Sequence, residues 1–325
     1  MRRLFIFIVV LILLAGAVAG AGFFWLQTAY TASSHTDTDK IIVIERGSSV
    51  ASIARQLQEE GLIQYARVFR LGIRLIADRR PLQAGEYRIP AQASAAEIAS
   101  ILKSGEQVVH KTTLAEGLSS IQIVDLLRDE PLLAGKIETV PPEGTLLPET
   151  YHFHRGETRT EILRRMRTAL DDVLSELWAT RAADLPFSTR EEAMILASIV
   201  EKETAVEAER ELVAGVFVNR MKKGMRLQSD PTVVYGITRG AGPLGRPLSR
   251  GDLDAETAYN TYRIDGLPPT PIANPGRASI AAVLNPAKTD ALYFVADGSG
   301  GHAFAKTLDE HNRNVRAWRK IQRDN

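Results

Sequence analysis

The chain has 325 residues, and its 40 lysines and arginines against 39 aspartates and glutamates give a formal net charge of +1 at pH 7. Without an excess or a run of basic residues it has little means of condensing on phosphate, so we expect no nucleic-acid partner. It contains no cysteine, which excludes disulfides and thiolate metal sites.

The N-terminal stretch predicts a membrane anchor. Residues 4–26 carry no charge and would form a helix of about 34 Å, enough to cross the hydrocarbon core of a bilayer. A cleaved secretory signal is the alternative, since small residues that suit cleavage occur at 15–17, but the apolar core of a signal runs only about 7 to 15 residues. Arg2 and Arg3 precede the span, so we expect residues 1–3 in the cytoplasm and the bulk of the chain outside.

Beyond the anchor, the sequence predicts a linker and a small mixed α/β module. Residues 27–40 are rich in threonine, serine, alanine and aspartate without an apolar period, which is typical of a tether. The module covers residues 41–105, and its expected elements are a strand over 41–44, helices over 50–57, 65–76 and 94–104, and a turn and strand over 81–90. It resembles a lysin-motif (LysM) module, a fold that often binds N-acetylglucosamine polymers; a structural spacer is the alternative.

Residues 106–325 form the larger expected domain, again of mixed α/β type, so that the whole chain is assigned to the α+β class. Its predicted elements include a strand over 107–114 and helices over 119–128, 159–182, 192–204 and 207–223. The helix over 159–182 carries large apolar residues at helical spacing, which is typical of packing rather than of a site.

A glutamate ends the apolar face of the helix predicted over 192–204. Residues three and four apart share a helix face, which places Glu203 in one stripe with Leu196, Ile199 and Val200. A carboxylate held against apolar groups has its charged form disfavoured, so its pKa rises toward the range that general acid/base catalysis needs. Glu201 must point elsewhere. The alternative is that Glu203 is one more polar residue at the end of an amphipathic helix.

Downstream of that helix, loops rich in polar and aromatic residues alternate with proline and glycine turns. Asparagine, glutamine, serine and tyrosine donate and accept hydrogen bonds, so this composition suits a neutral ligand with many hydroxyl and amide groups, such as a sugar polymer. The candidate substrate-binding residues are Gln228, Ser229, Asp230, Tyr259, Asn260 and Tyr262. The alternative is that these side chains build turns and pack, and Asp230, which precedes Pro231, has the shaping of a turn as its competing role.

Several motifs follow one another along the chain: EGTLLPETY at 143–151, ASIVEKET at 197–204, GMRLQSDPTVVY at 224–235, AYNTY at 258–262, GLPP at 266–269, NPG at 274–276, NP at 285–286 and LYFV at 292–295. Through them the chain resembles, over nearly its whole length, the endolytic murein transglycosylases, the MltG or YceG-like family. The resemblance implies a single-pass enzyme of the cell inner membrane with its catalytic domain in the periplasm. It also implies that the second glutamate of Glu-Lys-Glu, here Glu203, is catalytic.

An enzyme of that family cuts nascent peptidoglycan glycan strands internally, leaves 1,6-anhydro-N-acetylmuramic acid ends and terminates strand elongation. The partners so implied are glycan strands and the membrane, with peptidoglycan synthases as candidate partners through the membrane segment. One rival is a hydrolase in which a second acid, Asp230 or Glu149, activates water or attacks the sugar. Another is a membrane-tethered, peptidoglycan-binding scaffold without catalysis.

We expect neither a metal nor a cofactor. His152 and His154 would share one face of a strand, while His302 and His311 lie far from them in sequence, and scattered histidines are more often surface groups than ligands. His302 lies among glycines and is a candidate for the border of the cleft. No nucleotide-binding glycine motif occurs.

Overall fold

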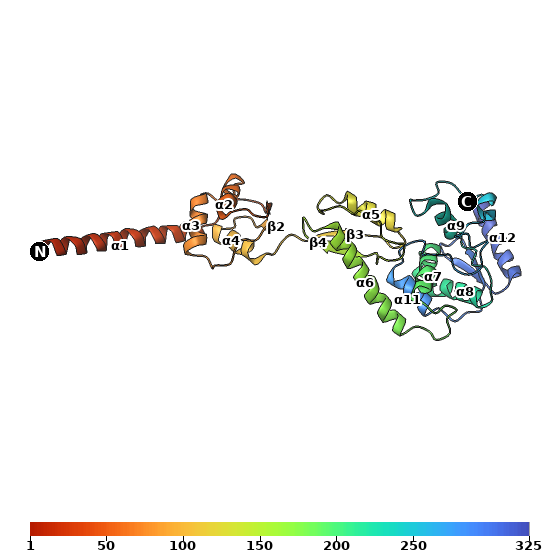
Figure 1. The fold of residues 1–325 in the computed structure, drawn as a ribbon. Coiled ribbons are helices and arrows are strands. Elements are labelled where there is room, and N and C mark those ends of the chain that lie inside the picture. Colours follow the sequence, from red (N-terminus) through yellow and green to blue (C-terminus); the bar gives the residue numbers. More distant parts are fainter. Residues whose placement is uncertain (325) are drawn as a thin grey trace. The chain divides into compact units, whose positions relative to one another are not determined.

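The computed structural model describes residues 1–324 and divides into two compact units, Met1–His110 and Lys111–Asn325 (Figure 1). Both units combine helices with short two-stranded sheets, so the chain is a mixed α/β protein. We call them the N-terminal and C-terminal units and describe each by itself.

The N-terminal unit begins with a long apolar helix, α1 (Arg2–Thr31), whose most apolar window has a mean hydropathy of 3.0. Within residues 1–324 it is the one helix long and apolar enough to cross a membrane. It continues past residue 26 into the stretch expected to be a linker, because Leu26 and Tyr30 are buried in the core of this unit. Tyr30 lies so close to Gly72 that a Cβ there would meet its ring at 2.3 Å.

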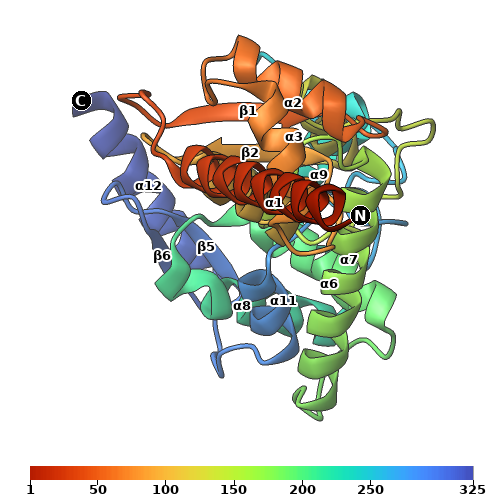
Figure 2. The same ribbon diagram turned by 90° about the vertical axis from the view of Figure 1, so that its left-hand side faces the viewer.

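The rest of this unit is a two-stranded antiparallel sheet packed with three helices (Figure 1 and Figure 2). Strands β1 (Lys40–Ile44) and β2 (Gly85–Ile89) pair so that Ile42 faces Tyr87, and both of these side chains are buried. The helices are α2 (Val50–Glu59), α3 (Ala66–Leu75) and α4 (Ala95–Ser104). Local capping residues bound two of these helices: Ser49 accepts a hydrogen bond from the first turn of α2, and α4 ends at Gly105 in the left-handed region.

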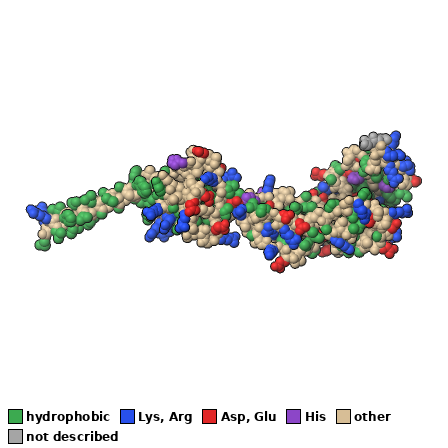
Figure 3. Space-filling view, turned by 90° about the horizontal axis from the view of Figure 1, so that it is seen from above, with side chains coloured by type: hydrophobic (Ala, Val, Ile, Leu, Met, Phe, Trp, Pro, Cys, Tyr) green, Lys and Arg blue, Asp and Glu red, His purple; other side chains and the backbone are tan. Residues whose placement is uncertain are grey.

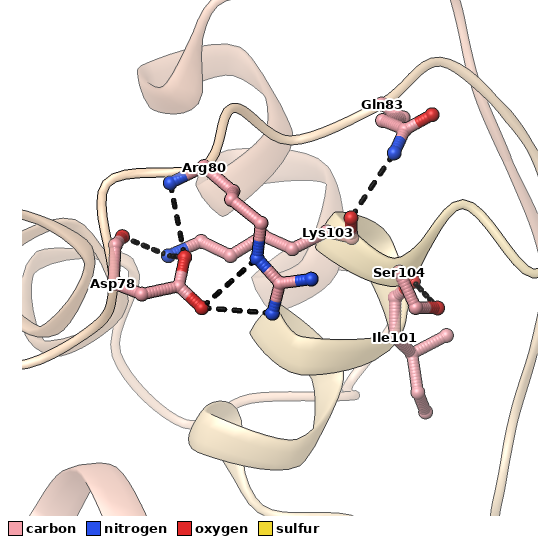
Figure 4. Close-up of polar contacts among 6 residues, drawn as sticks. All are labelled: Asp78, Arg80, Gln83, Ile101, Lys103 and Ser104. Carbon is pink, nitrogen blue, oxygen red and sulfur yellow. Dashed lines mark hydrogen bonds and ion pairs between the residues drawn. The ribbon is translucent and has the colours of Figure 1, made fainter.

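The loop after α3 is tied to α4 by charges (Figure 4). Lys103 is almost fully buried, and its Nζ donates to the Asp78 carbonyl at 2.6 Å and lies 3.3 Å from the Asp78 carboxylate. Arg80 pairs with the same carboxylate at 2.9 Å, and its hydrogen bonds lower the pKa of Asp78 to about 2. Asp78 therefore pairs with both neighbouring cations.

The C-terminal unit holds two small sheets among helices. Strand β3 (His110–Thr113) pairs with β4 (Thr150–Phe153), and β5 (Tyr293–Ala296) pairs antiparallel with β6 (His302–Ala305). The helices are α5 (Ser120–Asp129), α6 (Arg159–Ala179), α7 (Arg190–Glu203), α8 (Arg210–Lys222), α9 (Asp230–Thr238), α10 (Arg250–Asp254), α11 (Arg277–Leu284) and α12 (Leu308–Asp324), with a 3₁₀ turn η1 at Glu207–Glu209.

Helix α7 is the centre of this unit and packs against both α8 and α11. Residues 193–200 are all buried, so the apolar surface surrounds the helix instead of forming the single stripe that the sequence predicts. The reason is that neighbouring helices cover more than one side of it. A capping box between Thr189 and Glu192 starts α7, and the helix ends at Glu203, which places that side chain where the buried core meets the loops.

Candidate active site

Glu203 is half-buried, and one of its carboxyl oxygens is firmly held. The hydroxyl of Ser229 donates to Oε1 at 2.5 Å, while Oε2 has no hydrogen-bond partner among residues 1–324. Burial raises the pKa of Glu203 to about 7, and the bond from Ser229 opposes that rise because it favours the charged form. The carboxyl is therefore poised to exchange a proton near neutral pH.

Backbone and threonine hydrogen bonds fix the loop that carries Ser229. The Ser229 amide donates to Thr261 Oγ1 at 2.9 Å, and the Thr232 hydroxyl donates to the Ser229 carbonyl at 2.7 Å. Gln228 takes the left-handed region at φ +50°, which costs a non-glycine residue about 1 kcal/mol, and its amide is held by the Thr261 carbonyl at 3.1 Å. This loop thus aims a buried serine at Glu203 and leaves the side chain of Gln228 exposed.

A polar cavity of about 320 Å³ opens beside Glu203. Its lining residues come from helices α7, α8, α9 and α12, from strand β5 and from the loops between them: Glu203, Arg220, Leu227, Gln228, Asp230, Tyr262, Tyr293, Phe294, Leu308 and His311. The Arg220 side chain is buried and donates to the carbonyls of Leu292 and Leu227, each at 2.6 Å. Among residues 1–324 no carboxylate forms an ion pair with Arg220, so its positive charge favours an anion in the cavity, and it lowers the pKa of Glu203.

Asp230 and Tyr262 lie together on the same cavity. The Tyr262 hydroxyl donates to Asp230 Oδ1 at 2.7 Å, and Asp230 is the first residue of α9. Asp230 also lines a second cavity of about 410 Å³ on the side of Tyr235 and Lys202. Asp230 therefore borders two cavities within the C-terminal unit.

Two of the predicted binding residues lie buried in the supporting loop. The Asn260 side chain is 0% exposed, and its amide donates to the carbonyls of Asp252 at 3.3 Å, Leu253 at 3.0 Å and Ala255 at 2.6 Å. The Tyr259 hydroxyl bonds Thr270 at 2.7 Å. Both residues thus shape the loop that carries Tyr262, and neither lines the cavity beside Glu203.

Glu201 and Glu149, the other acids of the predicted motifs, lie elsewhere. Glu201 Oε2 accepts a hydrogen bond from the Gly276 amide at 3.0 Å, as expected for a residue that points away from Glu203. Glu149 is exposed and lines neither of the two cavities. Of the acids considered from sequence, the structure brings Asp230 together with Glu203.

A histidine–glutamate pair borders the site. His302 Nδ1 and Glu209 Oε2 lie 2.7 Å apart, and the other oxygen of Glu209 accepts from the His302 amide at 2.9 Å. His302 lies near enough to Glu203 to lower the pKa of that carboxyl, but it does not line the cavity beside Glu203. Among residues 1–324, no group of three or more acidic or histidine side chains is arranged to hold a metal.

Arg220 and Glu209 are site residues that the sequence did not single out. Arg220 lies in a helix that also carries Lys222 and Lys223, and nothing in this run distinguishes a buried arginine from solvated ones. Glu209 belongs to the acidic turn η1, typical of a solvated surface. The places of Arg220 and Glu209 in the site depend on contacts with the β5–β6 region, which lies far along the chain from both residues.

A mixed α/β protein in which a poorly hydrated carboxyl faces a polar cavity has the arrangement of a general acid/base enzyme. The family model described as YceG-like matches residues 42–317, and the chain belongs to that family.

Named relatives agree with this membership. An endolytic murein transglycosylase of Bacillus subtilis is 32% identical over 303 residues, which are 84% of this chain and 82% of that protein. An endolytic murein transglycosylase of Streptococcus pneumoniae is 26% identical over 362 residues, covering 95% of this chain, which spans 64% of that protein's length. The crystal structure of a YceG-like protein from Listeria monocytogenes matches with a TM-score of 0.52 and 29% identity, over 85% of this chain and 98% of that one.

Proposed function

We propose that this chain is an endolytic lytic transglycosylase that cuts peptidoglycan glycan strands at the bond between N-acetylmuramic acid and N-acetylglucosamine. The names of its relatives support the class of reaction and of substrate. The observation that carries the proposal is the half-buried carboxyl of Glu203, with a pKa of about 7, on a polar cavity.

In the first step, protonated Glu203 donates its proton to the oxygen that links the two sugars. The bond between this oxygen and C1 of the muramyl residue breaks, the departing N-acetylglucosamine takes up the proton as a free 4-hydroxyl, and positive charge develops at C1. Oε2 suits this donation, because the other oxygen is occupied by Ser229. Arg220 and His302 then stabilise the carboxylate that remains.

In the second step, the same carboxylate removes the proton from the muramyl 6-hydroxyl. The hydroxyl oxygen attacks C1 of its own sugar and closes the 1,6-anhydro ring, so neither water nor an enzymic nucleophile is consumed. Because the attack is intramolecular, the protein contributes mainly by holding the sugar in the reactive conformation. One carboxyl therefore serves as acid and then as base.

Gln228, Asp230 and Tyr262 are the proposed contacts to sugar, since all three line the cavity. The second cavity, on the far side of Asp230, gives the strand a surface beyond the cleavage point. A strand that is held on both sides of the cut suits internal cleavage. Ser229, Tyr259 and Asn260 support these groups from within the protein.

The cellular role follows from the anchor. The apolar part of α1, with Arg2 and Arg3 before it, supports the proposal of a single-pass protein of the cell inner membrane whose chain beyond α1 lies in the periplasm. There it cuts nascent strands and terminates their elongation, beside peptidoglycan synthases. Residues 41–105 act as a LysM-like module that holds N-acetylglucosamine.

The test compares two matched glutamate-to-glutamine substitutions on one helix. Glu203→Gln removes the transferable proton and should lower the rate of strand cleavage at least about 100-fold. Glu201→Gln, two residues away, should keep most of the activity. An active Glu203→Gln enzyme, with folding checked by circular dichroism, contradicts the proposal.

A hydrolase is the second candidate, and the shared cavity of Asp230 and Glu203 is the observation that favours it. In that mechanism Asp230 activates water, so Asp230→Asn should abolish cleavage as thoroughly as Glu203→Gln does. In the lyase mechanism Asp230→Asn weakens only a sugar contact and leaves cleavage within about tenfold of the wild type. A non-catalytic scaffold predicts no cleavage by any of these proteins.

A further inference from the structure

The N-terminal unit carries a basic cavity of about 500 Å³ on α3. Arg67, Arg70 and Arg74 line it together with the aliphatic side chains of Leu71 and Val50. The three arginines are three and four residues apart, so they share one face of the helix, and all three are exposed. The cavity thus combines concentrated positive charge with apolar surface.

These arginines have no acidic partner among the residues that the structure describes. In the adjoining loop, by contrast, Arg80 and Lys103 both pair with the carboxylate of Asp78 (Figure 4). A helix face with three uncompensated guanidinium groups repels itself unless an anion binds to it. The arrangement therefore indicates an anionic ligand from outside the chain.

The position of α3 relative to α1 identifies the source of that ligand. Phe24 and Trp25 of α1 are 72% and 59% exposed, whereas Leu26 is 5% exposed and buried in this unit. The lipid-facing surface of α1 thus ends where the module begins, with a tryptophan at the boundary, as is common at membrane interfaces. Figure 1 shows α3 beside this end of α1, where Tyr30 lies against Gly72, and Figure 3 shows lysine and arginine side chains gathered on the edge of the module where α1 enters it.

We propose that α3 lies on the membrane surface and binds the headgroup phosphates of anionic phospholipids through Arg67, Arg70 and Arg74. Guanidinium groups pair with phosphate oxygens through two parallel hydrogen bonds. Leu71 and Leu75, which are 44% and 56% exposed, enter the acyl boundary beside them. This contact is independent of the Glu203 chemistry, and with α1 it fixes the module at two places on one leaflet.

The test uses the full chain, because Leu26 and Tyr30 of α1 belong to the core of the module. The protein is placed in nanodiscs of phosphatidylcholine alone or with about one third phosphatidylglycerol, and amide hydrogen exchange is measured over α3. Each basic residue near an anionic surface strengthens binding about fivefold, so exchange in α3 should be at least about tenfold slower with phosphatidylglycerol. High salt should remove the difference.

The triple variant Arg67→Gln, Arg70→Gln, Arg74→Gln should lose this protection. The matched control Arg46→Gln, Arg55→Gln, Arg88→Gln removes the same charge from residues outside the cavity lining and should keep it.

Exchange over β1 reports folding and should not change in any disc. If the triple variant proves unfolded by this measure, Arg70→Gln alone serves for the comparison and should lose about fivefold of the protection. Equal protection in the two kinds of disc overturns the proposal, as does protection that survives the loss of the arginines. Protection by inorganic phosphate in phosphatidylcholine discs also overturns it, since the ligand would then be a free anion.

Discussion

The Ser229 hydroxyl donates a 2.5 Å hydrogen bond to Glu203, joining the last residue of α7 to the N-cap of α9. Two opposing effects meet in this contact. Burial disfavours the charged carboxylate, whereas the hydrogen bond favours it, and the balance leaves the pKa of Glu203 at about 7. Ser229 thus orients the carboxyl and keeps its pKa from rising further.

Replacing Ser229 should change both the rate and its pH dependence. Ser229→Ala removes the bond that favours the carboxylate, so the pKa of Glu203 should rise and the alkaline fall of kcat/KM should move to higher pH. Because the carboxyl also loses its fixed orientation, kcat should fall about 10- to 100-fold. Ser229→Thr keeps a hydroxyl and should retain most of the rate and most of the wild-type pH dependence. A Ser229→Ala enzyme with a lower rate but an unchanged pH profile would show that Ser229 is merely structural.

The pH dependence of the wild type should follow the acid form of Glu203. The free enzyme needs this carboxyl protonated, so kcat/KM should be steady below about pH 7 and fall about tenfold per pH unit above it. The measurement is the initial rate of cleavage of purified glycan strands across the range. A fall that begins near the ordinary pKa of a glutamate, about 4.5, would mean that Glu203 is not desolvated in solution.

The same pKa shift predicts a pH-dependent stability. The pKa of Glu203 is raised in the folded protein, so the stability from this group is fully present below about pH 4.5 and is lost as the pH rises through about 7. Glu203→Gln carries no charge at any pH and escapes this loss. The Tm of Glu203→Gln relative to the Tm of the wild type should therefore increase between pH 5 and pH 8. Burial also raises the pKa of Glu143 to about 7, but this residue is present in both proteins and affects them alike. A constant difference in Tm argues against a desolvated Glu203.

Asn260 and Gln228 should give opposite phenotypes. Asn260→Ala leaves three carbonyls at the C-terminal end of α10 without their buried donor and should lower the free energy of unfolding by about 2 kcal/mol, with little change in KM at temperatures where the variant is folded. Gln228→Asn keeps a residue that tolerates positive φ but shortens an exposed amide on the cavity. It should raise KM and leave stability nearly unchanged, as chemical denaturation would measure. The reverse pattern would make Asn260 the substrate contact.

The sequence was sufficient to single out Glu203, because an acid at the end of an apolar helical stretch is a local pattern. The cap of α2 and the end of α4 at Gly105 depend on hydrogen bonds within a few residues and are also accessible from sequence, whereas α7 begins at Arg190, two residues before the predicted start. The all-round burial of α7 was not, because it depends on helices that return from distant parts of the chain.

The polar loops show the same division between local and long-range information. The composition singled out Tyr262 and Asn260 together, although Tyr262 lines the cavity and the Asn260 amide is bound by three carbonyls at the end of α10. Sequence alone gives the hydrogen-bonding capacity of a side chain but not the groups that use it. Arg220 shows the converse, since a basic residue that looked solvated is buried beside the catalytic candidate.

The central claim is that one carboxyl breaks the strand and that the sugar closes on its own hydroxyl. Digestion of glycan strands in ¹⁸O-labelled water, followed by mass spectrometry of the new muramyl ends, tests it most directly. The account predicts ends that are one water lighter than hydrolysed ends and contain no ¹⁸O. New ends that have gained water and carry one ¹⁸O would contradict it and assign the cleavage to a hydrolase.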